Sequence, residues 1–333
     1  MLKKRITLLG GGSWGTALAK LLAENGHDVT VWLRDEEQCK AMSIERVNKK
    51  YLPKVTIPEN IKFTSNINEA TENSEFILIV TPTQMIRGIL KQLNNENKTN
   101  KVIINASKGI EIGTMCLVSD IVKEETINCT FAVLSGPSHA EEVGLCLPTA
   151  ITVACEDKQV AEEIQDAFMS TYFRVYTNED VIGVELGGAL KNIIALGAGI
   201  SDGVGFGDNA KAALMNRAIV EIARLGIAMG ADVHTFYGLS GIGDLIVTCT
   251  SKHSRNWNAG YLIGQGLTKD EAIKKIGMAV EGIPTTYAAY ELSKKLNVDM
   301  PIVDAMYDVL EHDTNVKEKV NNLMLRDKKE EKL

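Results

Sequence analysis

The stretch Gly10-Gly11-Gly12-Ser13-Trp14-Gly15 decides the fold, because it places the spacing Gly-x-Gly-x-x-Gly between a predicted strand and a predicted helix. The strand is the apolar run Arg5–Leu9. The helical pattern covers Trp14–Glu24 and ends at Asn25-Gly26, where glycine suits the left-handed cap. A strand, a tight glycine turn and a helix in this order predict the start of a βαβ unit.

The three glycines of this motif have separate roles in a loop that binds a dinucleotide. Gly10 permits the tight turn, Gly12 lets the backbone approach a pyrophosphate, and Gly15 lets the helix pack closely on the strand. The pyrophosphate would lie on the free N–H groups at the positive end of the helix. The motif therefore predicts binding of a nicotinamide dinucleotide, the alternative being a plain glycine-rich turn.

The first half of the chain alternates β-branched runs with helical patterns, which is typical of a parallel sheet. The predicted strands are Arg5–Leu9, Asp28–Leu33, Ile61–Thr64, Phe76–Val80, Val102–Asn105, Thr130–Leu134, Ala150–Ala154 and Phe173–Tyr176. Pro82 is expected to open a helix after the fourth strand. From about Asn178 onward, helical patterns replace the strand patterns. We expect an α/β fold, with an N-terminal Rossmann-type doubly wound parallel sheet (1–178) followed by an all-α domain (179–333).

Composition limits the classes of protein to which the chain can belong. Its 333 residues suffice for two domains, and 45% hydrophobic with 24% charged residues is typical of a globular protein. A formal net charge of -7 argues against a nucleic-acid partner. The six cysteines are scattered and lack metal-ligand spacing, so we expect reduced thiols and no bound metal.

Two segments imitate membrane or export signals. Lys3-Lys4-Arg5, an apolar stretch and Ala17-Leu18-Ala19 resemble a secretory signal, but the glycines that interrupt the stretch favour a strand, a turn and a helix. The apolar stretch Val181–Ile200 contains Glu185 and Lys191 and falls short of a clean transmembrane span. We therefore expect a cytoplasmic protein without a membrane span.

The end of the second predicted strand should contact the adenosine ribose of the dinucleotide. Arg34 and Asp35 stand there. Arginine can bind a 2′-phosphate, whereas aspartate can accept a hydrogen bond from a free 2′-hydroxyl. Because Arg34 stands nearest the expected ribose position, we expect both NADH and NADPH to bind, with a preference for NADPH. The alternative is that Arg34 is an ordinary surface arginine.

Two further loops follow predicted strands, where ligands bind in open α/β sheets. Lys108 lies in the first loop and could polarise a substrate carbonyl, although most lysines are merely exposed. The second loop includes Gly136-Pro137-Ser138, which could line a small polar substrate or be only a turn. We assign no chemistry to His139 beside it.

In the helical half, Lys191 shares a helix face with Gly187, Ile194, Ala195 and Ala198. A lysine on such an apolar face either extends its ammonium to solvent or is functional, because burial lowers the pKa of a lysine toward that of a general base.

Polar residues also gather between positions 244 and 256. Asp244 could orient a nearby lysine or cap a helix. The run Ser254-Arg255-Asn256 combines a guanidinium with neutral donors, a set that can recognise phosphate or can simply be exposed.

Together these segments closely resemble the bacterial-type NAD(P)-dependent glycerol-3-phosphate dehydrogenases. The matching motifs run in order along nearly the whole chain: GGGSWGTALA (10–19), NASKGIE (105–111), LSGPSHAEE (134–142), ELGGALKNIIALGAG (185–199), GIGDLIVTCTSKHSRN (241–256) and VEG (280–282). The combination is far more specific than the first motif, which occurs in many Rossmann enzymes.

The resemblance implies interconversion of dihydroxyacetone phosphate and sn-glycerol 3-phosphate, which supplies phospholipid synthesis. It implies that Lys191 exchanges the proton and that Lys108 and Asp244 complete the catalytic set. The implied cofactor contacts are Gly10, Gly12, Ser13, Trp14, Gly15, Arg34, Lys108, Ala140, Arg255, Ala279 and Glu281. The implied substrate contacts are Lys108, Gly136, Ser138, Lys191, Asn192, Asp244, Thr248, Ser254, Arg255 and Asn256.

Other functions remain open from the sequence. A related two-domain dehydrogenase could act on a 2-hydroxy acid or a sugar acid, and would need a carboxylate contact in place of the phosphate set. A cofactor-binding sensor without catalysis is a third possibility, against which both lysines and Asp244 argue. The small-residue helices of the second half could support a homodimer.

Overall fold

The computed structural model describes residues 3–312, 314–328 and 330–331. The chain forms two compact units: Met1–Lys108 with Cys116–Val184, and Gly109–Met115 with Glu185–Leu333. The division between residues 178 and 179 that we expect for the domains stays a prediction. It differs from the compact units in two places, because the change of unit lies within a helix and the segment Gly109–Met115 joins the second unit.

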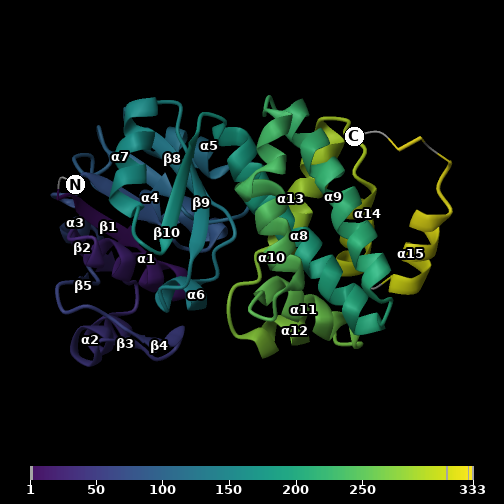
Figure 1. Ribbon diagram of the computed structural model, residues 1–333, viewed down its shortest axis with the longest axis horizontal. Helices are drawn as coiled ribbons and strands as arrows, with labels where there is room; N and C mark the ends of the chain where they lie inside the picture. The colour runs from purple at the N-terminus through teal and green to yellow at the C-terminus, as the bar shows by residue number, and fades with distance from the viewer. Residues whose placement is uncertain (1–2, 313, 329, 332–333) are drawn as a thin grey trace. The chain divides into compact units, whose positions relative to one another are not determined.

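The first unit contains an eight-stranded sheet in the order β10-β9-β8-β7-β6-β1-β2-β5 (Figure 1). Its strands are β1 (Arg5–Leu9), β2 (Asp28–Trp32), β5 (Lys62–Thr64), β6 (Phe76–Ile79), β7 (Val102–Asn105), β8 (Thr130–Ser135), β9 (Thr149–Ala154) and β10 (Phe173–Asn178). All neighbouring pairs are parallel except β8 and β9. The predicted Rossmann-type fold with a parallel sheet is confirmed, with the single difference that β9 and β10, parallel to each other, run antiparallel to the other strands.

The reversal at β9 has a local cause. Only one short helix, α6 (Ala140–Gly144), lies between β8 and β9, and it packs against the first helix of the unit. A parallel pairing would instead need a crossover element lying over a face of the sheet.

Helices cover both faces of the sheet, and consecutive side chains of each strand point to opposite faces. The central strands β1, β6 and β7 therefore contribute to two apolar clusters. In β1, Ile6 and Leu8 belong to one apolar cluster and Leu9 to the other. The first cluster includes residues of α1 (Ser13–Glu24), α2 (Glu36–Glu45) and α7 (Lys158–Phe168). The second includes residues of α3 (Ile67–Thr71), α4 (Ile86–Leu90) and α5 (Val118–Glu125).

The chain leaves β1 toward β2 on one side and returns to β6 on the other, so a topological switch point lies at β1. Ligands of open α/β sheets bind beyond the carboxyl ends of strands at this point. The glycine loop (residues 10–15) begins there. Pro82 precedes a short 3₁₀ turn, η1 (Thr83–Met85), before α4 begins.

A small hairpin that the sequence pattern did not reveal lies between α2 and β5. It pairs β3 (Val47–Asn48) with β4 (Leu52–Thr56) in antiparallel orientation, outside the main sheet. Leu52 and Val55 of this hairpin are buried in the apolar cluster that includes α1.

Among the residues that the structure describes, the second unit has helices joined by loops and contains no strand, as predicted. Its helices are α8 (Val181–Val204, whose first turn belongs to the first unit), α9 (Asp208–Ala228), α10 (Asp244–Thr250), α11 (Arg255–Gly264), α12 (Lys269–Ile276), α13 (Gly282–Lys295), α14 (Pro301–Glu311) and α15 (Val316–Met324), with the short turns η2 (Val233–Tyr237) and η3 (Leu239–Gly243). α8 and α11 touch backbone to backbone, because a Cβ atom on Gly199 would lie 2.0 Å from the Trp257 carbonyl oxygen.

Helix α8 is long and apolar enough to cross a membrane by length and composition. In this structure 94% of its most apolar window is buried inside the protein. Core helices of globular proteins have the same length and apolar composition.

Glu221 of α9 predicts a pH dependence of stability. It is buried, both carboxylate oxygens accept the Ile302 N–H at 3.0 Å, and burial raises its pKa to about 8. The pKa of Glu221 is thus higher in the folded state than in the unfolded state. The contribution of protonated Glu221 to the free energy of unfolding is therefore fully present below pH ~4.5 and is lost as pH rises through about 8. We expect stability to fall by on the order of a few kcal/mol over this range, as measured by urea unfolding.

Glu221→Gln provides the control, because it keeps an acceptor for Ile302 but does not titrate. Its stability should vary less between pH 5 and pH 8 than that of the wild type. Parallel pH profiles for the two proteins would refute the role of Glu221.

Candidate active site

The glycine loop has the geometry that a dinucleotide requires. The Gly10 N–H donates to the Trp32 carbonyl at 3.1 Å, which ties the loop to the end of β2. A Cβ atom on Gly15 would lie 2.1 Å from the Gly10 carbonyl oxygen, so this position admits only glycine. A Cβ atom on Gly12 would meet nothing within 4 Å, so its bare backbone is open to a ligand. These residues therefore fit a pyrophosphate.

The residues around this loop that are predicted to contact the cofactor lie in different environments. Ser13 begins α1, and the half-buried Trp14 packs on the apolar cluster beneath it. Arg34 is exposed just after β2. The Asp35 carboxylate accepts the Gln38 N–H at 3.0 Å and caps α2. Of the two residues that could contact the adenosine ribose, Asp35 thus uses its carboxylate to cap α2, whereas Arg34 is exposed to solvent.

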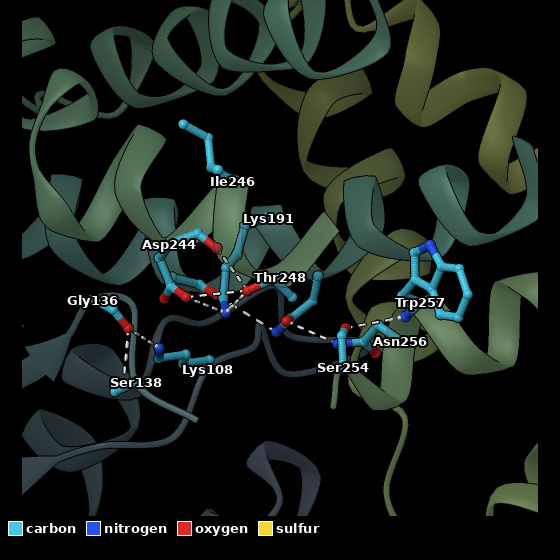
Figure 2. A network of polar contacts seen from close by, with 12 residues as sticks. Lys108, Gly136, Ser138, Lys191, Asp244, Ile246, Thr248, Ser254, Asn256 and Trp257 are labelled. Carbon is cyan, nitrogen blue, oxygen red and sulfur yellow. Dashed lines mark hydrogen bonds and ion pairs between the residues drawn. The ribbon is translucent and has the colours of Figure 1, made fainter. Parts of the chain in front are cut away.

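In the first unit, Lys108 and Ser138 both bond to one carbonyl of the loop after β8 (Figure 2). The Lys108 ammonium and the Ser138 hydroxyl each donate to the Gly136 carbonyl oxygen at 3.0 Å. Gly136 has a φ of 144°, and a Cβ atom there would lie 2.9 Å from Ile151 Cα. Glycine is thus required at this turn. Ala140 is buried at the start of α6.

In the second unit, Lys191 lies in a buried polar cluster with Asp244 and Thr248 (Figure 2). The Lys191 ammonium donates to Asp244 Oδ1 at 2.6 Å and to Thr248 Oγ1 at 2.7 Å. Only 6% of Lys191 and 1% of Asp244 are exposed. Lys191 therefore does not extend its ammonium to solvent, and Asp244 orients the lysine rather than capping α10.

The predicted phosphate-recognition run Ser254-Arg255-Asn256 divides into three environments. Ser254 is buried and caps α11 by accepting the Trp257 N–H at 3.1 Å. Arg255 is exposed at the first position of the same helix. Asn256 is buried and links three helices. Its amide donates to Asn192 Oδ1 of α8 and accepts the Gly282 N–H of α13, both at 2.9 Å.

The remaining predicted cofactor contacts of the second unit lie just before α13. Ala279 is exposed, and Glu281 is half-buried at the N-cap of that helix. Among the residues that the structure describes, no group of three His, Cys, Asp or Glu residues could hold a metal ion.

Two features of these groups escaped the sequence patterns. The Asn192–Asn256 pair joins residues far apart in the chain, and no periodicity marks it. Asn48 of the small hairpin donates to the Gly11 carbonyl of the glycine loop at 2.9 Å. Its strand is only two residues long, too short for a recognisable pattern.

Comparison with known proteins shows that both halves of the chain match family models of the same enzyme. Residues 5–161 match the family model of the NAD-dependent glycerol-3-phosphate dehydrogenase N-terminus, and residues 180–321 match that of the C-terminus. The chain is 51% identical over 333 residues to glycerol-3-phosphate dehydrogenase (NAD(P)+) of Enterococcus faecalis, which covers 99% of this chain and 98% of that protein. It is 52% identical over 330 residues to the enzyme of the same name from Bacillus cereus, covering 98% and 97%.

A solved structure agrees with these matches. The crystal structure of glycerol-3-phosphate dehydrogenase from Coxiella burnetii is 37% identical in sequence and has a TM-score of 0.92, covering 97% of this chain and 99% of that one. The sequence motifs, the Rossmann-type sheet and the helical second half therefore have one explanation: this chain belongs to the NAD-dependent glycerol-3-phosphate dehydrogenase family.

Proposed function

We propose that this chain reduces dihydroxyacetone phosphate to sn-glycerol 3-phosphate with NADH or NADPH, reversibly, and thereby supplies phospholipid synthesis. Family membership over both halves supports this function and does not favour the alternative, a 2-hydroxy acid or sugar-acid dehydrogenase. The observation that carries the proposal is the buried Lys191, whose ammonium bonds to Asp244 and Thr248. A lysine so placed can give one proton from its ammonium form and take one in its neutral amine form.

When bound, the reduced nicotinamide supplies the hydride that converts the ketone into an alkoxide. Lys191 stabilises the developing negative charge on the oxygen and donates a proton to it. In the oxidation of glycerol 3-phosphate, Lys191 accepts the hydroxyl proton. Asp244 and Thr248 hold the Nζ atom in place through both directions. Removing one partner of a buried pair of this kind leaves the other charge uncompensated and is strongly destabilising.

The other proposed substrate contacts hold the phosphate and the polar carbons. Arg255 has the planar, fully charged group that binds phosphate best, and its exposure leaves it available. Binding energy at the phosphate helps to fix the carbonyl for reaction. We assign the remaining substrate contacts to Lys108, Gly136, Ser138, Asn192, Ser254 and Asn256.

For the cofactor, we propose that the glycine loop with Gly10, Gly12 and Gly15 and the start of α1 at Ser13 and Trp14 hold the pyrophosphate. Further contacts are assigned to Arg34, Lys108, Ala140, Arg255, Ala279 and Glu281. We further propose residues 1–178 as the dinucleotide-binding domain and residues 179–333 as the helical substrate-binding and catalytic domain, in line with the ranges of the two family models.

We also propose that the protein acts in the cytoplasm as a homodimer without a membrane span. The burial of most of α8 supports the last point. Sedimentation analysis of the purified protein tests the oligomeric state.

Arg34 predicts the cofactor preference. Arg34→Ala should lower kcat/KM with NADPH by about tenfold relative to NADH, because one charge-assisted contact to the 2′-phosphate contributes ~1.4 kcal/mol or more. Initial rates with both cofactors measure the ratio. Arg174, exposed on β10, is the matched arginine, and Arg174→Ala should leave the ratio unchanged. An unaltered ratio in Arg34→Ala would exclude a role in cofactor choice.

A spectrophotometric assay tests the proposed function directly. The wild-type protein is mixed with NADH or NADPH and with dihydroxyacetone phosphate, pyruvate or a sugar acid, and oxidation of the cofactor is followed at its nicotinamide absorbance. We expect turnover with dihydroxyacetone phosphate alone. Turnover of a keto acid instead would support the related dehydrogenase. Binding of cofactor without any turnover would indicate a sensor.

A further inference from the structure

Asn48 lies in the small hairpin of β3 and β4, outside the β1–α1–β2 unit, and its side chain contacts the glycine loop. Its amide nitrogen donates to the Gly11 carbonyl at 2.9 Å and to Thr16 Oγ1 at 2.8 Å. Only 1% of Asn48 is exposed. A buried amide whose two donors bond to the glycine loop and to the first turn of α1 is well placed to fix the position of that loop.

The orientation of the amide is determined from its other end. Asn48 Oδ1 accepts the Tyr51 N–H at 3.2 Å inside the hairpin. Since the oxygen is engaged there, the NH₂ group must face Gly11 and Thr16. The hairpin itself is seated by Leu52 and Val55, both buried in the apolar cluster of the first unit. Asn48 therefore has a rigid base.

Thr16 extends the contact to the next peptide of the loop. Its hydroxyl donates to the Gly12 carbonyl at 2.8 Å, and its N–H donates to the same oxygen at 3.0 Å. The carbonyl oxygens of Gly11 and Gly12 are thus both held on the protein side, one by Asn48 and the other by Thr16.

Holding a carbonyl also aims the next N–H group. In a trans peptide the C=O and the following N–H point in opposite directions, and the described residues contain no cis peptide bond. With the Gly11 carbonyl held toward Asn48, the Gly12 N–H points away from the hairpin. With the Gly12 carbonyl held by Thr16, the Ser13 N–H points outward from the start of α1. These are donors that a pyrophosphate at this loop would use.

We propose that Asn48 is a positioning residue for the cofactor: acting through Gly11 and Thr16, it holds the N–H groups of Gly12 and Ser13 in the orientation that binds the pyrophosphate. This inference rests on the proposed function, because it requires a dinucleotide at the loop. By this proposal the small hairpin increases the affinity of the protein for the cofactor.

Cofactor binding in the absence of substrate tests the proposal. Asn48→Ala is titrated with NADPH and the dissociation constant is read from the change in nicotinamide fluorescence. We expect Kd to rise about tenfold, as for the loss of one or two neutral hydrogen bonds. At saturating NADPH, kcat and the KM for dihydroxyacetone phosphate should stay close to wild type, because the proposed role of Asn48 is confined to the loop that binds the cofactor.

Asn97 provides the matched control. It is a buried asparagine of the same unit, and its amide donates to the Asn68 carbonyl at 2.8 Å, away from the glycine loop. Asn97→Ala should lower the melting temperature but leave Kd for NADPH within about twofold of wild type, well under one tenfold step of affinity. A purely structural role for Asn48 would make the two variants behave alike and would overturn the proposal.

Thr16 supplies a second pair of variants if Asn48→Ala does not fold. Thr16→Val removes the hydroxyl that accepts from Asn48 and donates to Gly12, and should raise Kd for NADPH. Thr16→Ser keeps the hydroxyl and should restore affinity. Equal affinity in Thr16→Val and wild type would also overturn the proposal. A wild-type protein that binds neither NADPH nor NADH would overturn the proposed function itself, and the role of Asn48 with it.

Discussion

Lys191→Met is expected to reduce kcat for dihydroxyacetone phosphate by a factor on the order of 10³, because the variant has no group to donate the proton. Its Kd for NADPH should stay near the wild-type value. Stopped-time assays with excess enzyme measure the residual rate, and fluorescence titration measures cofactor binding. Full activity in this variant would refute the assignment of Lys191.

Two further variants separate chemistry from stability. Lys191→Met leaves the buried Asp244 carboxylate without its cation, which costs about 3–5 kcal/mol in comparable pairs. The double variant Lys191→Met with Asp244→Asn removes both charges and should recover stability without recovering activity. Lys211 forms a comparable 2.7 Å pair with Asp202 in the same unit. Lys211→Met should keep kcat within about twofold of wild type, a difference well under 1 kcal/mol.

Gly15→Ala is expected to weaken NADPH binding by on the order of 100-fold, about 2.7 kcal/mol. The new Cβ atom would lie 2.1 Å from the Gly10 carbonyl oxygen, which belongs to backbone and cannot rotate away. The glycine loop or α1 must therefore shift, and the N–H groups at the pyrophosphate shift with it. Fluorescence titration with NADPH measures the loss.

Gly88→Ala is the matched control for this change. Gly88 lies in α4, and a Cβ atom there would meet nothing within 4 Å. The variant should bind NADPH as the wild type does and should gain about 0.4–1 kcal/mol of stability from the lower entropy of its unfolded chain. Wild-type affinity in Gly15→Ala would show that the loop tolerates the displacement.

The main sheet could be predicted from local patterns. The bounds of β1 and β7 agree with the expected strands, because strands buried on both faces form continuous apolar runs between turn residues. The direction of β9 could not be predicted, since the residues of a strand do not specify whether it pairs parallel or antiparallel with its neighbour. The hairpin of β3 and β4 also lacked a signal, because its first strand is two residues long.

The candidate site shows the same limit in its side chains. Motifs identified Lys191, Asp244 and Thr248 as candidates, but the lysine is separated from the other two by 53 and 57 positions. Whether Lys191 reached solvent or a partner depended on how α8 and α10 pack. For Ser254 and Asn256, packing likewise determined that one caps a helix and the other joins three helices.

The sequence by itself determined the dinucleotide loop, the positions of the main-sheet strands along the chain, the change to helices in the second half, and the family. These properties are local or depend on the order of motifs, so that residue type and spacing suffice to specify them. Only the tertiary structure decided which side chains meet, including the buried Lys191–Asp244 pair and the contact of Asn48 with Gly11. Such contacts join residues distant in the chain, and their geometry depends on the packing of whole elements, which residue types alone do not specify.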